Sequence, residues 1–201
     1  MGIFDKLKRL FIIGIIFGLL CSLTGCNKES STSENSSGSS IDQTEILTKI
    51  FNDNQKHIQD LSSLLISVSL RDGEAINISL DENAKLTSHN NRVYRYKLQE
   101  GKLEGDFADQ YHESLTNNSD AIEMLNELKS NGDIDNIFIE GNSDVTTISF
   151  YINKSAIPEI CETNNNAGAE IIYCSNSDYA NKHGYILITD NYYGYVYPRP
   201  E

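Results

Sequence analysis

Hydrophobic residues recur at helical spacing soon after residue 42. Asp42 precedes Glu45 by three positions, a capping-box spacing with Asp in the Ser/Thr place. The apolar positions that follow are Leu47, Phe51, Ile58, Leu61 and Leu65. A second helix is predicted over 119–130, with Asp120 and Glu123 in its first turn and Gly132 after its end. These are the two principal helices that the pattern predicts.

Elsewhere apolar and polar residues alternate, which is typical of strands. The clearest case is 66–70 and 76–80, separated by Asp72-Gly73, which predicts a hairpin lying against the first helix. Further strands are predicted at 93–98, 134–140, 145–153, 169–174, 185–189 and 192–197. Helices that do not alternate with every strand favour the α+β class, so we expect a single domain over 41–201 with a mainly antiparallel sheet.

The first 26 residues have the composition of an export signal. Lys6, Lys8 and Arg9 precede the apolar run 10–20, which is too short to span a bilayer as a mature helix. The segment closes with Leu23-Thr24-Gly25-Cys26, which resembles the lipobox of bacterial lipoproteins.

That resemblance implies a cellular location but no activity. In that family the cysteine carries a diacylglyceryl thioether and a signal peptidase cuts just before it. Residues 1–25 would then be a signal peptide and Cys26 the lipidated N-terminus, anchored in the cell membrane on its extracytoplasmic side. An ordinary cleaved signal and a chance cysteine in an uncleaved anchor are the alternatives. Residues 26–40 are serine-rich and predict a flexible tether.

The charge narrows the choice of partners. The chain has 16 Lys and Arg against 29 Asp and Glu, a formal charge of −13. This balance excludes a nucleic-acid binder that neutralises phosphates. Removing residues 1–25 takes away three basic residues and one acidic residue and leaves a formal charge of −15. Such a body attracts cationic partners through long-range steering.

Two of the four cysteines remain after export and lipidation. Cys161 and Cys174 form either a disulfide, as an even count in an exported domain allows, or two buried thiols. Neither residue lies in a recognisable nucleophile motif, so a catalytic cysteine is not expected.

Candidate metal and catalytic groups are few. Asp53, His57 and Asp60 share one face of the first predicted helix, but one helix offers at most these three ligands and no partner is identifiable, so the polar flank of an amphipathic helix is the preferred interpretation. His89, His112 and His183 lie in predicted loops without metal-site spacing. No nucleotide-binding or serine-hydrolase motif occurs in the sequence, and we expect no metal and no cofactor.

Tyrosine is concentrated near the C-terminus. Because strand side chains alternate, Tyr193, Tyr195 and Tyr197 share one face of the last strand, while Tyr192 and Val196 point the other way. A row of amphipathic rings makes a good contact surface, so these three residues are candidates for partner binding. Ordinary sheet packing is the alternative, because tyrosine favours strands.

The last part of the chain also has a family likeness. It contains Thr147-Ile148-Ser149-Phe150-Tyr151, Glu170-Ile171-Ile172-Tyr173 and Asn191-Tyr192-Tyr193-Gly194-Tyr195. It is similar to the C-terminal parts of uncharacterised clostridial exported proteins, with Tyr192 where those carry a Trp. The resemblance agrees with the predicted strands and implies no chemistry.

Three functions fit these patterns. The first is a membrane-anchored, non-catalytic binding or accessory module, such as an immunity or inhibitor lipoprotein, with a cationic protein partner. The second is a cell-envelope hydrolase that uses Asp106, Asp109 or Glu113 before the second helix, which predicts two close carboxylates. The third is a structural subunit of a membrane complex, which predicts an exposed apolar patch.

Overall fold

The computed structural model describes residues 42–68, 70–84, 92–105, 112–141, 145–163 and 167–198. All of them belong to one compact unit, Ser40–Glu201. The predicted signal peptide, the tether and Cys26 lie outside the described residues.

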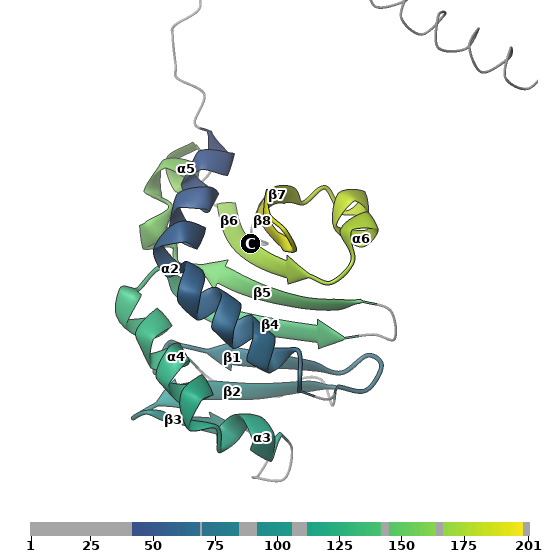
Figure 1. Cartoon of the computed structure of the whole chain (residues 1–201). Helices are drawn as coiled ribbons and strands as arrows, with labels where there is room; N and C mark the ends of the chain where they lie inside the picture. Colours follow the sequence, from purple (N-terminus) through teal and green to yellow (C-terminus); the bar gives the residue numbers. More distant parts are fainter. Residues whose placement is uncertain are drawn as a thin grey trace, which may run out of the picture. The chain divides into compact units, whose positions relative to one another are not determined.

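A single mixed sheet forms the framework of this unit (Figure 1). Its strands are β1 (Ala75–Ser79), β2 (Val93–Gln99), β3 (Lys102–Gly105), β4 (Ile134–Gly141), β5 (Thr146–Ile152), β6 (Ala167–Cys174), β7 (Ile186–Thr189) and β8 (Tyr192–Pro198). Their order is β3-β2-β1-β4-β5-β6-β8-β7, and β1 with β2 is the one parallel pair among the described strands. The predicted α+β class with a mainly antiparallel sheet is confirmed.

The two predicted helices are present. In α2 (Gln43–Leu65) the Asp42 carboxylate caps the first turn by accepting hydrogen bonds from the backbone N–H groups of Thr44 (3.0 Å) and Glu45 (3.3 Å). In α4 (Ser119–Asn131) the Asn118 side chain caps the start, and Gly132 closes the end with a left-handed φ of 78°.

Four shorter helices were not predicted: α3 (Glu113–Thr116), the 3₁₀ turn η1 (Lys154–Ala156), α5 (Pro158–Thr163) and α6 (Ser177–Lys182). Each is shorter than the window of about 11 residues over which a helical repeat can be recognised. Ile157 and Ile160, around the start of α5, are buried in the main core, and Ala180 of α6 is buried in a smaller core.

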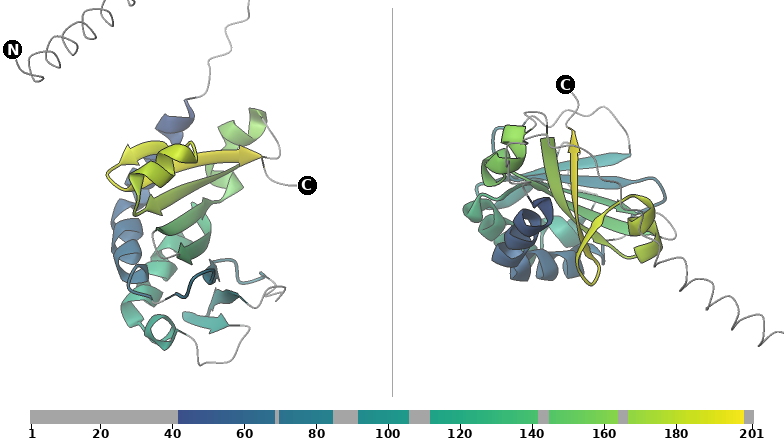
Figure 2. Two further views of the ribbon diagram at one scale, coloured as in Figure 1. Left: turned by 90° about the vertical axis from the view of Figure 1, so that its right-hand side faces the viewer. Right: turned by 90° about the horizontal axis from the view of Figure 1, so that it is seen from above.

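Helices α2 and α4 cover the same face of the sheet, as Figures 1 and 2 show. The main core lies between them and the strands. It includes Phe51, Ile58 and Leu61 from α2, Leu125 and Leu128 from α4, and Ile76, Ile78, Ile137, Ile148, Phe150 and Ile171 from the sheet.

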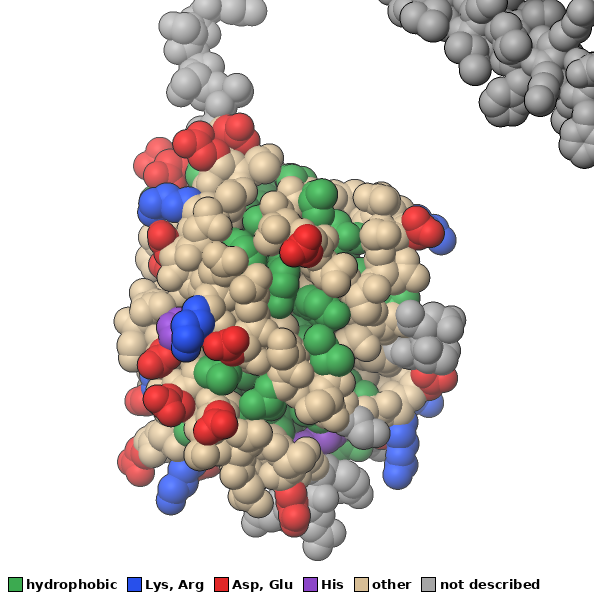
Figure 3. Space-filling model, viewed as in Figure 1, with side chains coloured by type: hydrophobic (Ala, Val, Ile, Leu, Met, Phe, Trp, Pro, Cys, Tyr) green, Lys and Arg blue, Asp and Glu red, His purple; other side chains and the backbone are tan. Residues whose placement is uncertain are grey.

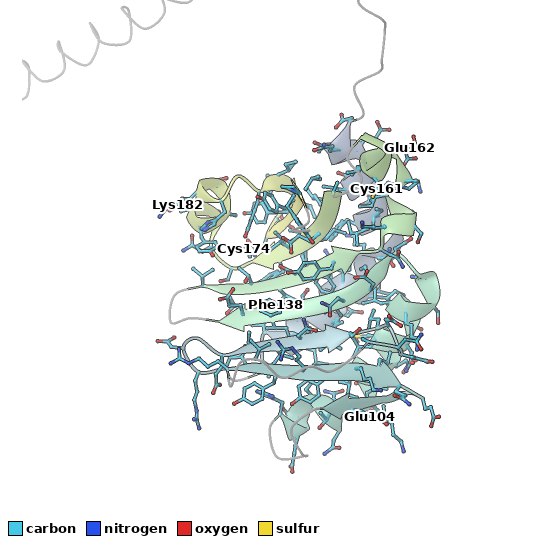
Figure 4. The ribbon with its side chains drawn as sticks, turned by 180° about the vertical axis from the view of Figure 1, so that it is seen from behind. Glu104, Phe138, Cys161, Glu162, Cys174 and Lys182 are labelled. Carbon is cyan, nitrogen blue, oxygen red and sulfur yellow. The ribbon has the colours of Figure 1, made fainter. Side chains whose placement is uncertain are left out.

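Acidic side chains gather on the outer side of the helices (Figure 3). The opposite face of the central strands is free of helices in the part that the structure describes (Figure 4).

The predicted hairpin of 66–70 with 76–80 is wrong. Helix α2 runs to Leu65, and hydrogen-bonded turns continue through Ile66 and Val68. The second half of the prediction is correct as β1, but β1 pairs with β2 and β4. Gly73 does form a turn, with φ 76°, and this turn leads from the helix into the sheet. Five alternating residues identify an extended tendency but not a pairing partner, and here both edges of β1 are taken by distant strands.

A buried polar network fastens α2 to α4. Asn54 is 1% exposed, and its Nδ2 donates to Asp133 Oδ2 (2.8 Å) and to the Ile50 carbonyl (3.0 Å). Its Oδ1 accepts from Asn131 Nδ2 (2.9 Å), at the last residue of α4. Because Asp133 directly precedes β4, a single side chain links both helices to the sheet.

Replacing Asn54 with Ala is therefore expected to destabilise the fold by about 2 kcal/mol, because Asp133 and Asn131 lose a buried partner. Chemical denaturation of residues 40–201 measures the change. Asn52→Ala, at an exposed position of the same helix, is the control and is expected to change the unfolding free energy by less than about 0.5 kcal/mol. Equal effects of the two variants would contradict the network's role.

Candidate functional site

The sheet has two chemically different faces. Alternate residues of β1, β2, β4 and β5 point away from the helices and are largely polar: Asn77, Ser79, Arg95, Lys97, Asn136, Thr147 and Ser149. We call this side the helix-free face. Phe138 also lies on it, at the middle of β4 (Figure 4). When a sheet packs against other elements on one side alone, its other side faces water and is polar, so the polar residues of this face are expected.

The corner of this face at β5, β6 and β8 is aromatic instead. Tyr192 and Val196 of β8 pack into the main core, while Tyr193 and Tyr195 belong to a second cluster on the opposite side, and Tyr197 contacts Tyr195. The predicted alternation is therefore confirmed. Tyr193, however, is only 3% exposed because Ala180 of α6 packs in the same cluster, so the expectation that it forms a contact surface is wrong.

Four half-buried rings remain on the surface and form what we call the tyrosine row: Tyr185, Tyr195, Tyr197 and Tyr151. Ring centroids are 5.5 Å apart between Tyr185 and Tyr195 and 5.9 Å apart between Tyr195 and Tyr197. Tyr197 meets the ring of Tyr151 edge-on at 6.4 Å. These separations are typical of interacting aromatic pairs, so the row is one continuous surface across β8 and β5.

A carboxyl group lies within this row. Glu170 of β6 is in register with Tyr151 on one side and with Tyr195 on the other, so the three side chains share a face. Glu170 is 9% exposed. Its Oε2 accepts no hydrogen bond within the part of the chain that the structure describes. An acidic residue is thus buried in a strand that is otherwise apolar on both faces.

Burial changes the titration of the groups in this corner. Desolvation raises the pKa of Glu170, and a hydrogen bond with Ser149 partly offsets the rise. Desolvation, with the nearby Glu170 charge second, raises the pKa of Tyr151. The pKa of Tyr185 rises to about 12, mainly through desolvation, with Tyr179 and Glu170 adding to it. Tyr151 and Tyr185 are therefore neutral at physiological pH and present rings and hydroxyl groups.

A polar cavity of about 460 Å³ opens on the same face, toward β1, β2 and β4. Asn77, Arg95, Asp135 and Asn136 contribute to its wall. Arg95 Nη1 and Asn136 Oδ1 are buried and make no hydrogen bond to another described residue. The helix-free face thus combines an aromatic corner that holds a carboxyl group with a polar depression.

The metal-site candidates of the first helix have other partners. Asp53 lies 3.4 Å from Lys49 Nζ, and Asp60 lies 3.6 Å from Lys56 Nζ. His57 Nδ1 lies 2.8 Å from a carboxylate oxygen of Glu127 on α4. Among the described residues no three His, Cys, Asp or Glu side chains are grouped to hold a metal ion.

The two other histidines that the structure describes pack against tyrosines. His112 has a left-handed backbone, its Nδ1 is 3.1 Å from the Tyr96 hydroxyl, and burial lowers its pKa. His183 stacks on Tyr179 with ring centroids 3.9 Å apart. His89 lies outside the described residues.

The hydrolase candidates are only partly described. Glu113 is exposed at the start of α3, whereas Asp106 and Asp109 lie outside the described residues. The carboxylate pair of the hydrolase hypothesis therefore stays a prediction.

Of the two alternatives for the cysteines, the structure has free thiols and no disulfide: Cys174 is buried and Cys161 is half-buried. Cys174 is the last residue of β6, and Cys161 lies in α5, before the first residue of that strand. An eight-residue strand spans about 23 Å, whereas a disulfide requires Cα atoms within about 7 Å. Figure 4 shows the two labelled residues well apart.

Large exposed apolar side chains are sparse. Among the described residues they are Ile66, at 44% exposure, and Leu187, at 61%. No helix in the described ranges is both long and apolar enough to cross a bilayer.

Comparison of the chain with protein-family models, with curated proteins and with solved structures finds no match.

Several residues of this corner were not identified from the sequence, above all Glu170, Tyr151 and Ser149. One signal was present: Glu170 is the charged residue in the run Ala167-Gly168-Ala169-Glu170-Ile171-Ile172. A lone acid in a buried strand breaks the apolar pattern at a cost in stability, which marks a candidate site.

The buried carboxyl group has a measurable consequence for stability. Because the folded state raises the pKa of Glu170, the fold loses stability as the pH rises from the ordinary glutamate pKa to that raised value, and the full loss remains at higher pH. Glu170→Gln is therefore expected to raise the melting temperature of residues 40–201 at pH 7.5 by about 2–4 °C, the shift that about 1 kcal/mol gives in a domain of this size. The gain should shrink toward pH 4, where Glu170 carries a proton.

Differential scanning calorimetry at several pH values measures this difference. Glu140→Gln is the matched control, because Glu140 is exposed at the end of β4. It is expected to leave the melting temperature unchanged. A destabilising Glu170→Gln at pH 7.5 would show that the carboxylate has a stabilising partner after all.

Proposed function

We propose that the chain is a non-catalytic binding module, held on the extracytoplasmic face of the cell membrane through a lipid on Cys26, and that its helix-free face binds a cationic protein. The export-signal composition and the Leu23-Thr24-Gly25-Cys26 sequence support the anchor. The serine-rich segment 27–40 would hold the acidic body away from an anionic membrane surface.

The observation that carries the binding role is the tyrosine row around Glu170. Four half-buried rings and a buried carboxyl group lie on the sheet face that α2 and α4 leave uncovered, beside the short helix α6. Tyrosine gives a large contact area at a low cost in side-chain entropy, and a carboxylate selects positive charge. The formal charge of −13 also attracts positively charged partners at long range.

Lipidation predicts a specific dependence on one cysteine. Cells grown with an alkyne-labelled fatty acid should incorporate the label into the wild-type chain, and Cys26→Ala should abolish incorporation and leave residues 1–25 uncleaved. Cys21→Ala is the control, because Cys21 lies in the segment that is removed, and should keep the label. Label retained on Cys26→Ala would contradict the anchor.

The contact surface is tested by affinity capture from the native cell envelope with immobilised residues 40–201. The double variant Tyr195→Ser, Tyr197→Ser should retain at least tenfold less of a basic partner than the wild type, since truncating central aromatic contacts costs about 2 kcal/mol or more. The retained partner should elute at elevated salt.

Leu187→Ser is the control, because it removes an exposed apolar side chain from β7 outside the row. It should capture the same partner as the wild type. Equal capture by the double variant, with circular dichroism showing intact folding, would place the contact elsewhere.

A further inference from the structure

We propose that Glu170 and the rings of Tyr151, Tyr195 and Tyr197 form a binding site for a primary ammonium group, the side chain of a lysine presented by the partner. This inference rests on the binding role proposed above and adds the chemical group that the helix-free face selects.

The strand register builds the walls of the site. Residues directly opposite on neighbouring strands have Cβ atoms about 5 Å apart, so Tyr151 and Tyr195 flank Glu170 on both sides. Tyr197 is in register with Gly168, two residues before Glu170 on the same face of β6. Its ring contacts both flanking tyrosines. Three rings therefore enclose one carboxyl group from three directions.

Hydrogen bonding leaves one acceptor in this enclosure without a donor. Glu170 Oε2 is buried and accepts no hydrogen bond, and none of the ion pairs found among the described residues includes Glu170. A buried carboxylate oxygen without a donor is costly, and an N–H donor that carries positive charge would relieve that cost most effectively. Neutral tyrosine rings add attraction for a cation placed over their faces.

The arrangement favours an ammonium group over a guanidinium. An arginine binds a carboxylate best through two parallel hydrogen bonds, one to each oxygen. Ser149 already hydrogen-bonds with the Glu170 side chain, which leaves a single oxygen without a partner. A lysine ammonium is a compact charge with three donors and needs only one acceptor here.

The need for an N–H donor also disfavours a quaternary ammonium group. A trimethylated group keeps the charge and suits the rings but has no N–H to donate, so Oε2 would stay unpaired. The hydrogen bond therefore separates lysine from its methylated form, and the charge separates it from acetyl-lysine.

The test uses three small probes with ¹⁵N- and ¹³C-labelled residues 40–201 in NMR titrations: Nα-acetyl-lysine methylamide, its Nε-trimethyl form and its Nε-acetyl form. The lysine amide should shift the ring signals of Tyr151, Tyr195 and Tyr197, with a Kd on the order of 1 mM, as for one isolated side chain. The other two probes should bind at least tenfold more weakly.

Two variants complete the design. Glu170→Gln should weaken binding of the lysine amide at least tenfold, and Glu140→Gln, an exposed acid on β4, should leave it unchanged. Because Glu170→Gln is expected to stabilise the fold, its loss of binding would not come from unfolding. Equal affinity for the trimethyl or acetyl probe, absence of binding by the wild type, or unchanged binding by Glu170→Gln would each overturn the inference.

Failure of this site and failure of the binding role are distinguishable. If envelope capture depends on Tyr195 and Tyr197 but the lysine amide does not bind, the ammonium site is wrong and the binding role stands. If the lysine amide binds as described but no envelope protein is captured, the site stands and the protein-binding role is wrong.

Discussion

One constraint shapes this molecule: its broad sheet has long helices on one side only. α2 and α4 bury the apolar residues of the central strands, and no comparable layer covers the reverse side in the described part of the chain. The reverse side must therefore meet water, which explains the asparagine, serine, threonine, arginine and lysine side chains of β1, β2, β4 and β5. Against this polar background the corner at β5, β6 and β8 is aromatic: Tyr193 is buried there with α6 in a second core, while Tyr151, Tyr195 and Tyr197 stay partly exposed around Glu170.

Glu170 is also a position where the side chain lowers the stability of the fold. A glutamine there would fill similar space without an ionic charge, and β6 is buried on both faces at every neighbouring position. Local rules agree through most of the fold: the helix caps, the apolar stripes and the alternation of the strands are consistent with one structure. Positions that break such agreement at a cost in stability are where binding sites are found. The inference of a ligand thus starts from a cost that folding does not explain.

The parts of the fold that the sequence predicted are those set by nearby residues. Asp42 and Gly132 mark helix ends through their own hydrogen bonds and backbone angles, and the strands of the second half follow from alternation. Pairing is different: the two edges of β1 are occupied by β2 and β4, which no local pattern indicates. β3 was missed because Leu103 is its only apolar residue among charges and a glycine.

The candidate site also has features that local sequence predicts and features that it does not. Which tyrosines of β8 share a face was predictable from the period of two, but the burial of Tyr193 depends on the short helix α6, and the role of Glu170 depends on register with strands β5 and β8. Those are contacts between segments that are distant along the chain. The only local sign of these contacts was a single acidic residue in an apolar run. It indicates a site only when Tyr151 and Tyr195 are known to lie on its two sides.

In the proposed binding role, two kinds of acidic group would act at different stages of recognition. The exposed carboxylates of α2 and α4, such as Asp53 and Glu127, are in contact with water, so salt screens them and they orient a partner poorly. They can raise the rate of encounter with a basic protein. Glu170 contributes little to the distant field but lies in a desolvated corner, where screening is weak and geometry is set by three rings. In that proposal, long-range attraction and selection at contact would come from opposite sides of the sheet, and selection would depend on the side that α2 and α4 leave uncovered.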